Sequence, residues 1–262
     1  MSQGYPFMAA SLEHMEREIL MQKHMHDRAP SVFMIGSNPF ALPFGTLKQY
    51  AELLRKHFPD FTKISMHSRV DDIEKKTDEE LQQLYDLGIR HLFIGTENGN
   101  ESALKIMNKG HTVAEAVKQL HRLGVADIKY TCQYIIGMAG RGKGRESGRA
   151  TAQFLNSVRA ERVMPTGLTV FPGSSLPEMV RNNEFVEASE KEKIEEMLVF
   201  FEHLTVDIFF EAIHYLNPLH FRFQTGVLEA KEGVIDEIKT ILATHSEEEL
   251  ERIINRKQMH SL

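Results

Sequence analysis

The feature that most constrains the fold of this chain is a repeated alternation of short apolar segments with amphipathic segments. The apolar segments have the composition and length of strands, and the segments between them have the spacing of helices. Chains with this alternation form right-handed βαβ units around a parallel sheet. The expected strands lie in 31–39, where the strand stops at Gly36 and the chain turns at Asn38-Pro39, and in 62–70, 90–97, 127–137 and 165–173. The expected helices cover 9–27, 46–58, 77–88, 101–108, 111–124 and 147–158.

The expected strands are apolar runs rather than strictly alternating ones, which is typical of a parallel sheet covered on both faces. A doubly wound sheet and an incomplete (β/α) barrel both fit this pattern. In either fold, ligands bind at the C-terminal ends of the strands. Beyond about residue 188 the pattern becomes helical.

The composition limits which partners the protein is expected to bind and in which compartment it is expected to occur. The net charge is −6, which gives no support for binding nucleic acid or an anionic membrane. No apolar run approaches the roughly 20 residues of a membrane helix, and the N-terminus does not have the pattern of a signal peptide. The single cysteine, Cys132, excludes an intrachain disulfide and indicates a reducing compartment. We therefore expect a cytoplasmic protein that binds a small molecule.

The stretch HLFIGTENGNES at 91–102 places a carboxylate at the end of an expected strand. A glycine such as Gly95 near the end of a strand allows a ligand to approach the backbone closely. Glu97 would then accept hydrogen bonds from ribose hydroxyls or from an amine. The alternative, equally open at this point, is that Glu97 caps the helix that follows.

Other candidate motifs are weaker. The loop GMAGRGKGRE at 137–146 lacks the Gly-Lys-Ser/Thr of a phosphate-binding loop and the spacing of a dinucleotide-binding turn, so it is interpreted as a flexible basic surface loop. No histidine pair has the spacing of a metal site with a supporting carboxylate. Cys132 lies inside an expected strand and is interpreted as a buried apolar residue.

Taken in order, these strand ends resemble the radical S-adenosylmethionine (radical SAM) superfamily. The most specific stretch is DLGIRHLFIGTENGNESALKIMNKGHT, which is similar to the family's helix–Gly–strand segment with Gly-x-Glu-Ser, Leu-Lys and Asn-Lys-Gly. IGSNP, YIIGMAG and LTVFPGSSL resemble other strand-end turns of the family. The branch with the greatest similarity includes oxygen-independent coproporphyrinogen oxidase and the cobalamin-associated radical SAM proteins.

The resemblance implies an incomplete parallel (β/α) barrel at 1–187, with its first strand missing, and a helical C-terminal extension at 188–262 packed on the barrel. It implies S-adenosylmethionine as a ligand. Glu97 matches the family's ribose-binding glutamate, Lys109 a contact to the methionine carboxylate, and Gln133 a ribose or amine contact. The other matching positions are a turn facing the methionine amino group and the end of the next strand, namely Ser37, Asn38, Pro39, Ser68 and Arg69. For Lys109 and Gln133, an exposed helix-end charge and a barrel-lining polar residue are the competing interpretations.

The cysteine content departs from the family. The family holds a [4Fe–4S] cluster with Cys-x-x-x-Cys-x-x-Cys, and such clusters need thiolate ligands. This chain has one cysteine, so no metal ligands or catalytic residues are assigned and the chain is expected not to hold the cluster alone. The first hypothesis is an N-terminally truncated or degenerate radical SAM protein. The second is a non-catalytic module that binds SAM or another nucleotide, and the third is an unrelated (β/α) enzyme with acid–base chemistry. The open barrel edge predicts a tendency to form homo-oligomers.

Overall fold

The computed structural model describes residues 8–256. The chain divides into two compact units. In the described residues, the first unit contains the chain up to Gly95 together with Lys118–Thr131, and the second contains Thr96–Val117 together with the residues from Cys132 onward. The elements that run from one unit into the other are β3 (Ile89–Glu97), α6 (Val113–Val125) and β4 (Lys129–Ile136).

Besides β3 and β4, the strands are β1 (Ser31–Met34), β2 (Lys63–Arg69), β5 (Arg162–Gly167), β6 (Phe209–Ala212) and β7 (Phe221–Gln224). They are hydrogen-bonded in the order β1-β2-β3-β4-β5-β6-β7. β1 pairs with β2, β2 with β3 and β5 with β6 in parallel, whereas β7 pairs with β6 antiparallel. This order confirms the expected parallel α/β fold, with β1 and β7 as its end strands.

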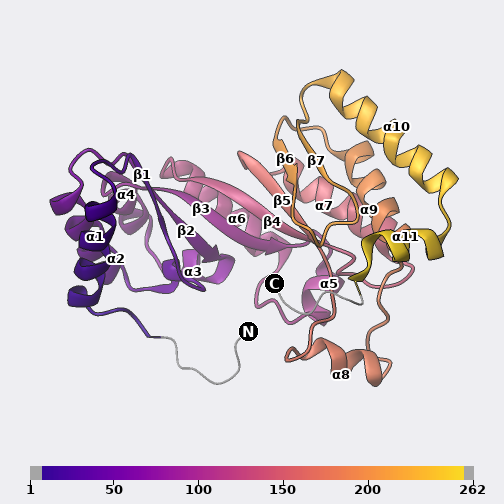
Figure 1. The fold of residues 1–262 in the computed structure, drawn as a ribbon, viewed down its shortest axis with the longest axis horizontal. Helices are drawn as coiled ribbons and strands as arrows, with labels where there is room; N and C mark the ends of the chain where they lie inside the picture. The colour runs from indigo at the N-terminus through magenta and orange to yellow at the C-terminus, as the bar shows by residue number, and fades with distance from the viewer. Residues whose placement is uncertain (1–7, 257–262) are drawn as a thin grey trace. The chain divides into compact units, whose positions relative to one another are not determined.

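Two helices of the first unit begin at a polar residue whose side chain caps the helix, at Ser11 and at Thr77. Thr77 and Glu80 form the predicted capping box of α4 (Asp78–Asp86), which satisfies backbone N–H groups that a helix start leaves without partners. α1 (Leu12–Met25) packs on α2 (Phe44–His57) (Figure 1). Between them, Glu16 accepts a 2.8 Å hydrogen bond from Lys56. The short helices of this unit are η1 (Pro39–Ala41) and α3 (Val70–Glu74).

Side chains along β3 alternate between two environments. Leu92 and Ile94 are fully buried, while Phe93 and Glu97 on the opposite face are only half-buried. Successive side chains of a strand point to opposite faces, so one face of β3 belongs to the core and the other stays accessible.

The second unit is organised around a close contact between α7 (Gly144–Asn156) and α9 (Glu190–His203) (Figure 1). A Cβ atom added to Gly148 would lie 2.3 Å from the carbonyl oxygen of Glu196, so only glycine allows the two backbones to approach this closely. An aromatic cluster continues the core, with the rings of Phe201 and Phe210 4.7 Å apart. The other helices of this unit are α5 (Glu101–Ile106), α8 (Leu176–Arg181), α10 (Leu228–Thr244) and α11 (Glu247–Ile254).

Three expectations require correction in the C-terminal half. β5 covers Arg162–Gly167 rather than 165–173, and β6 and β7 were not predicted because each has only four residues in a region of helical pattern. The 137–146 segment is only in part a surface loop, with Arg141, Gly142 and Lys143 exposed. Its residues 137–140 are buried, and the Gly142 N–H donates to the Glu192 carboxylate at 2.6 Å. α7 begins at Gly144, inside the segment interpreted as loop.

Candidate functional site

A turn of uncommon geometry places Glu97 at the end of β3. Its φ is +67°, in the left-handed region that side chains other than glycine rarely adopt. The Asn98 N–H donates to the Thr96 carbonyl at 2.8 Å and closes a three-residue turn around Glu97. Glu97 does not cap the following helix. The N-cap of α5 is Asn100, whose side chain accepts from the Ala103 N–H, so the alternative interpretation of Glu97 as a cap is wrong.

Residues on both sides of Glu97 anchor this turn. The Thr96 hydroxyl donates to the Gln133 carbonyl at 2.9 Å, and the Gly99 N–H donates to the Thr151 hydroxyl at 3.0 Å. Gly99 packs so tightly on α7 that an added Cβ would lie 2.5 Å from the Ala150 carbonyl oxygen. The backbone that presents Glu97 is therefore fixed on both sides.

The Glu97 carboxylate is paired with Lys109. The Lys109 Nζ lies 3.1 Å from Glu97 Oε2, and the two side chains are 28% and 23% exposed. Lys109 is therefore not a solvated helix-end charge. A half-exposed pair of this kind contributes only about 1 kcal/mol or less, so a ligand that offers better partners can replace it.

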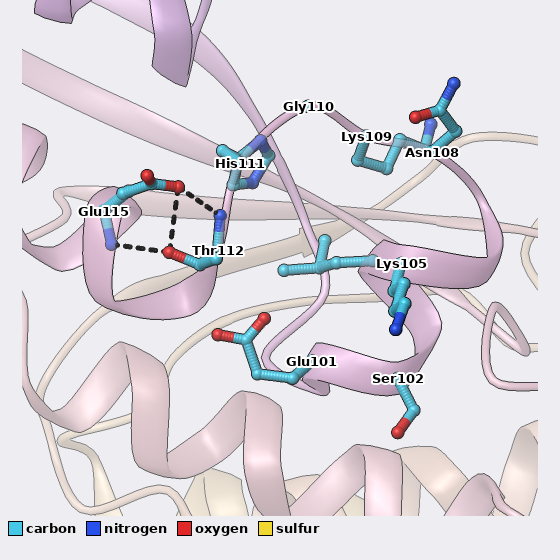
Figure 2. A pocket seen from close by; sticks show the side chains of 10 residues that line it. Glu101, Ser102, Lys105, Asn108, Lys109, Gly110, His111, Thr112 and Glu115 are labelled. Carbon is cyan, nitrogen blue, oxygen red and sulfur yellow. Dashed lines mark hydrogen bonds between the residues drawn. The ribbon is translucent and has the colours of Figure 1, made fainter.

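A cavity of about 470 Å³ borders this ion pair through Lys109 (Figure 2). The volume is in the range of pockets that take small molecules. Two carboxylates in its wall already bind the start of α6, because Glu101 accepts from the Val113 N–H and Glu115 accepts from the Thr112 N–H. The lining residues are Glu101, Ser102, Leu104, Lys105, Asn108, Lys109, Gly110, His111, Thr112 and Glu115.

The first unit contains the turn that was expected to face an amino group. Asn38 is half-buried, and its amide nitrogen donates to the Asp72 carboxylate. Its Oδ1 atom is buried and has no hydrogen-bond partner among the described residues. Ser37 is exposed, and Pro39 is buried at the start of η1. The turn therefore carries an unsatisfied acceptor of the kind that an ammonium group would satisfy.

The remaining expected site residues differ in accessibility. Ser68 is 4% exposed, and its hydroxyl donates to the Arg69 carbonyl at 2.9 Å. Arg69 is half-exposed and its Nε donates to Asp71 at 2.8 Å. Gln133 is half-buried on β4, in the second unit with Glu97 and Lys109.

A buried carboxylate that the sequence did not suggest lies close to the turn of β3. Glu196 on α9 is fully buried, and burial raises its pKa from 4.5 to about 7. It accepts hydrogen bonds from Tyr134, Gly137 and Ser147. It lies in α9 between the buried residues Lys193 and Phe200, in an acidic segment that gives no local signal of its burial.

The described residues do not fit an iron–sulfur cluster. Cys132 is fully buried on β4, and burial raises the pKa of its thiol to about 12, which opposes the thiolate form that iron requires. Between residues 8 and 256 no group of three or more His, Cys, Asp or Glu side chains is arranged to hold a metal ion. Across the same span, no helix has the length and apolarity needed to cross a membrane.

Comparisons with known proteins agree with the fold. The sequence model of the Radical SAM superfamily matches residues 2–154. An uncharacterized protein of Methanocaldococcus jannaschii is 28% identical over 177 residues, which cover 66% of this chain and 53% of that protein. An anaerobic magnesium-protoporphyrin IX monomethyl ester cyclase of Cereibacter sphaeroides is 35% identical over 88 residues, which cover 33% of this chain and 14% of that enzyme. The chain thus spans about half the length, or less, of these curated relatives.

Solved structures show the same fold at low sequence identity. Elp3 from Methanocaldococcus infernus has a TM-score of 0.57 at 15% identity, covering 87% of this chain and 58% of that one. The coproporphyrinogen III oxidase HemN from Escherichia coli, described as a radical SAM enzyme, has a TM-score of 0.56 at 16% identity, covering 71% and 43%. Methylornithine synthase (PylB) has a TM-score of 0.55 at 11% identity, covering 95% and 78%.

Proposed function

Because this chain belongs to the radical SAM superfamily, whose chemistry depends on S-adenosylmethionine, we propose that it binds this molecule at the end of β3. The observation that carries the proposal is the turn at Glu97, which holds a carboxylate in left-handed geometry beside Lys109. Strained backbone of this kind is kept where the surrounding structure enforces it, often at ligand sites. Glu97 would accept the ribose hydroxyls, and Lys109 would bind the methionine carboxylate.

The other family positions are proposed as further contacts. In the first unit, the buried Asn38 Oδ1 atom has no hydrogen-bond partner in the part of the chain that the structure describes, which suits the methionine ammonium group. Ser37, Pro39, Ser68 and Arg69 would shape the same region of that unit, and Gln133 would bind a ribose or amine group. These roles follow the family's positions along the chain.

The proposal does not include a cluster on this chain. One buried cysteine cannot supply three thiolates, so the 262 residues bind SAM without providing the ligands of a [4Fe–4S] cluster. Radical chemistry would then require thiolates from outside these residues, as in a truncated or degenerate family member. The second candidate is a non-catalytic SAM-binding or regulatory module, favoured by a well-anchored Glu97 in a chain with a single inert thiol. The same thiol content favours a reducing, cytoplasmic compartment.

Calorimetric titration of SAM into the purified chain tests this function. We expect binding without stoichiometric iron, and Glu97→Gln should weaken the affinity about tenfold or more because a charge-assisted hydrogen bond is lost. Glu178→Gln is the matched control. It removes an exposed carboxylate of α8 that lies 3.8 Å from Arg181, and it should leave the affinity unchanged. Absence of binding by the native chain would overturn the proposal, as would equal affinity of the Glu97→Gln variant. Stoichiometric iron would overturn the argument from cysteine content.

We also propose that the free edge of β1 favours self-association. β1 is an end strand of the sheet among the described residues. Phe33 in this strand and Ile35 just after it are 43% and 90% exposed. α1 also presents apolar surface, because Met21 and Met25 are more than half exposed. Unpaired edges and exposed apolar side chains both favour association. Sedimentation velocity should show concentration-dependent oligomers that Ile35→Lys reduces. A monodisperse native monomer at high concentration would contradict this.

A further inference from the structure

A chain of buried polar side chains leads from α9 to the turn that presents Glu97, entirely within the second unit. Glu196 Oε1 accepts hydrogen bonds from the Tyr134 hydroxyl at 2.6 Å and from the Ser147 hydroxyl at 2.7 Å. Glu196 Oε2 accepts from the Gly137 N–H at 2.8 Å. Glu196 and Ser147 both have no exposed surface, so water does not compete for these bonds.

The chain continues from Ser147 to Asn98, the residue that follows Glu97. The Asn98 amide nitrogen lies 3.0 Å from the Ser147 hydroxyl oxygen and 3.3 Å from the Ile135 carbonyl oxygen. The Asn98 amide oxygen accepts from the Asn100 N–H at 2.8 Å and lies 3.1 Å from the Ser147 hydroxyl. Asn98 is 2% exposed. Its own N–H closes the turn at Glu97, so Asn98 joins the buried network to the backbone that presents the carboxylate.

We propose that Glu196 is a positioning residue for Glu97, and that it acts through Ser147 and Asn98 to hold the carboxylate in the orientation that binds ligand. The inference rests on the proposed role of Glu97 in binding SAM. Glu196 itself has no exposed surface and does not touch the ligand. Its distance from Glu97 along the chain explains why a motif centred on β3 does not include it.

The hydrogens of this network can be counted. Ser147 has one hydroxyl hydrogen. When Glu196 is ionised, Ser147 donates that hydrogen to Glu196 and accepts from the Asn98 amide nitrogen, and all three donors around the carboxylate are satisfied. When Glu196 is protonated, it must donate from Oε1, because Oε2 faces an N–H group. Either Tyr134 or Ser147 must then accept, and a Ser147 that accepts from Glu196 turns its own hydrogen toward the Asn98 amide oxygen.

The charged and titratable groups around Glu196 come from each element that contacts it. Tyr134 faces it from β4, and burial raises the pKa of Tyr134 well above 10, so it remains a hydrogen-bond donor. α7 contributes Ser147, whose neighbour Glu146 accepts from the Asn100 amide nitrogen instead. On α9 itself the Lys193 ammonium is paired with Glu187 and Glu190. No ion pair of Glu196 with a cation is found among residues 8–256, and burial raises its pKa to about 7.

The test compares SAM affinity between the native chain and Glu196→Gln from pH 5.5 to 8.5. Glutamine has the shape of the protonated acid, so the two proteins should bind alike at pH 5.5. At pH 8.5 the variant should bind about tenfold more weakly, which corresponds to ~1.4 kcal/mol. The ratio of the two dissociation constants removes the titration of SAM itself. Glu195→Gln, a half-buried neighbour on α9, is the matched control and should give a ratio near one at every pH.

A second variant keeps the test decisive if Glu196→Gln folds poorly. Ser147→Ala leaves the bonds of Glu196 to Tyr134 and Gly137 but removes the hydroxyl that bonds to both Glu196 and Asn98. Ser147→Ala should weaken SAM binding at pH 8.5 and remove the pH dependence of the SAM affinity that Glu196 causes in the native chain. Thermal unfolding checks that the variant is as stable as the native chain. A ratio that stays constant with pH in a folded Glu196→Gln variant would overturn the positioning role. If Glu97→Gln weakens binding while both Glu196→Gln and Ser147→Ala do not, this inference fails and the SAM site stands. If Glu97→Gln has no effect, the site itself fails.

Discussion

Two strand ends in this molecule carry an asparagine, and they are held very differently. After β3, Asn98 is 2% exposed and both ends of its amide group have hydrogen-bond partners. After β1, Asn38 donates to Asp72, while its Oδ1 atom has no partner among residues 8–256. Ile35, near that second turn, is 90% exposed. The end of β3 is therefore organised before a ligand arrives, whereas the turn after β1 keeps a buried acceptor without a partner among the described residues. Preorganisation lowers the cost of binding, so most of the affinity should depend on the β3 end.

The strongest way to break the β3 end is to give Gly99 a side chain. Gly99→Ala places a Cβ 2.5 Å from the Ala150 carbonyl oxygen, and backbone cannot move away cheaply. We expect the free energy of unfolding to fall by about 3 kcal/mol. Gly45→Ala is the matched control near the β1 turn, because a Cβ there would have no neighbour within 4 Å, and it should raise stability by about 0.5 kcal/mol. Urea unfolding of both variants measures the contrast, and equal effects would contradict the tight packing at Gly99.

The buried acid behind the β3 end should make stability depend on pH. The pKa of Glu196 rises from 4.5 to about 7 on folding, so between these values the folded chain binds more protons than the unfolded chain. The contribution of Glu196 is therefore complete below pH 4.5, declines as pH rises and is lost above pH 7, with a span of up to ~3 kcal/mol. Glu196→Gln should remove this slope, whereas Glu195→Gln should retain it.

Urea unfolding across this pH range provides the measurement. A slope of equal size in the native chain and in Glu196→Gln would show that other groups cause it. Above pH 7 the variant should be no less stable than the native chain while binding SAM more weakly. A residue with a purely structural role would not separate stability from affinity in this way.

Removing each asparagine sharpens the comparison at a smaller scale. Asn98→Ala leaves the Asn100 N–H and the Ile135 carbonyl without their partner, and should cost about 2 kcal/mol. Asn38→Ala removes one hydrogen bond but also an unsatisfied acceptor, and should cost about 0.5 kcal/mol. Denaturant midpoints at constant m-value give both numbers. The interpretation of the β1 turn as the looser end would be wrong if Asn38→Ala were the more damaging change.

The sequence predicted the parts of the site that depend on local signals. The strand ending in Glu97 and the capping box at Thr77 are where the sequence placed them, because apolar runs and N-caps act within a few residues. Glu196 was missed because it lies in the acidic segment EKEKIEEM, where one more carboxylate indicates a solvated face. Its burial depends on the contact with Gly148, which no local pattern of α9 records. The loop at 137–146 was misread in part for the same reason, since its buried residues Gly137 and Gly144 contact α9 rather than their own neighbours.

The fully buried thiol of Cys132 has a practical consequence. Because the chain contains a single cysteine and burial keeps it protonated, a thiol reagent can label it only when β4 opens. The labelling rate in native buffer therefore measures how often β4 opens locally, and no engineered probe is needed. Slower labelling in the presence of SAM would show that a ligand suppresses the opening of β4.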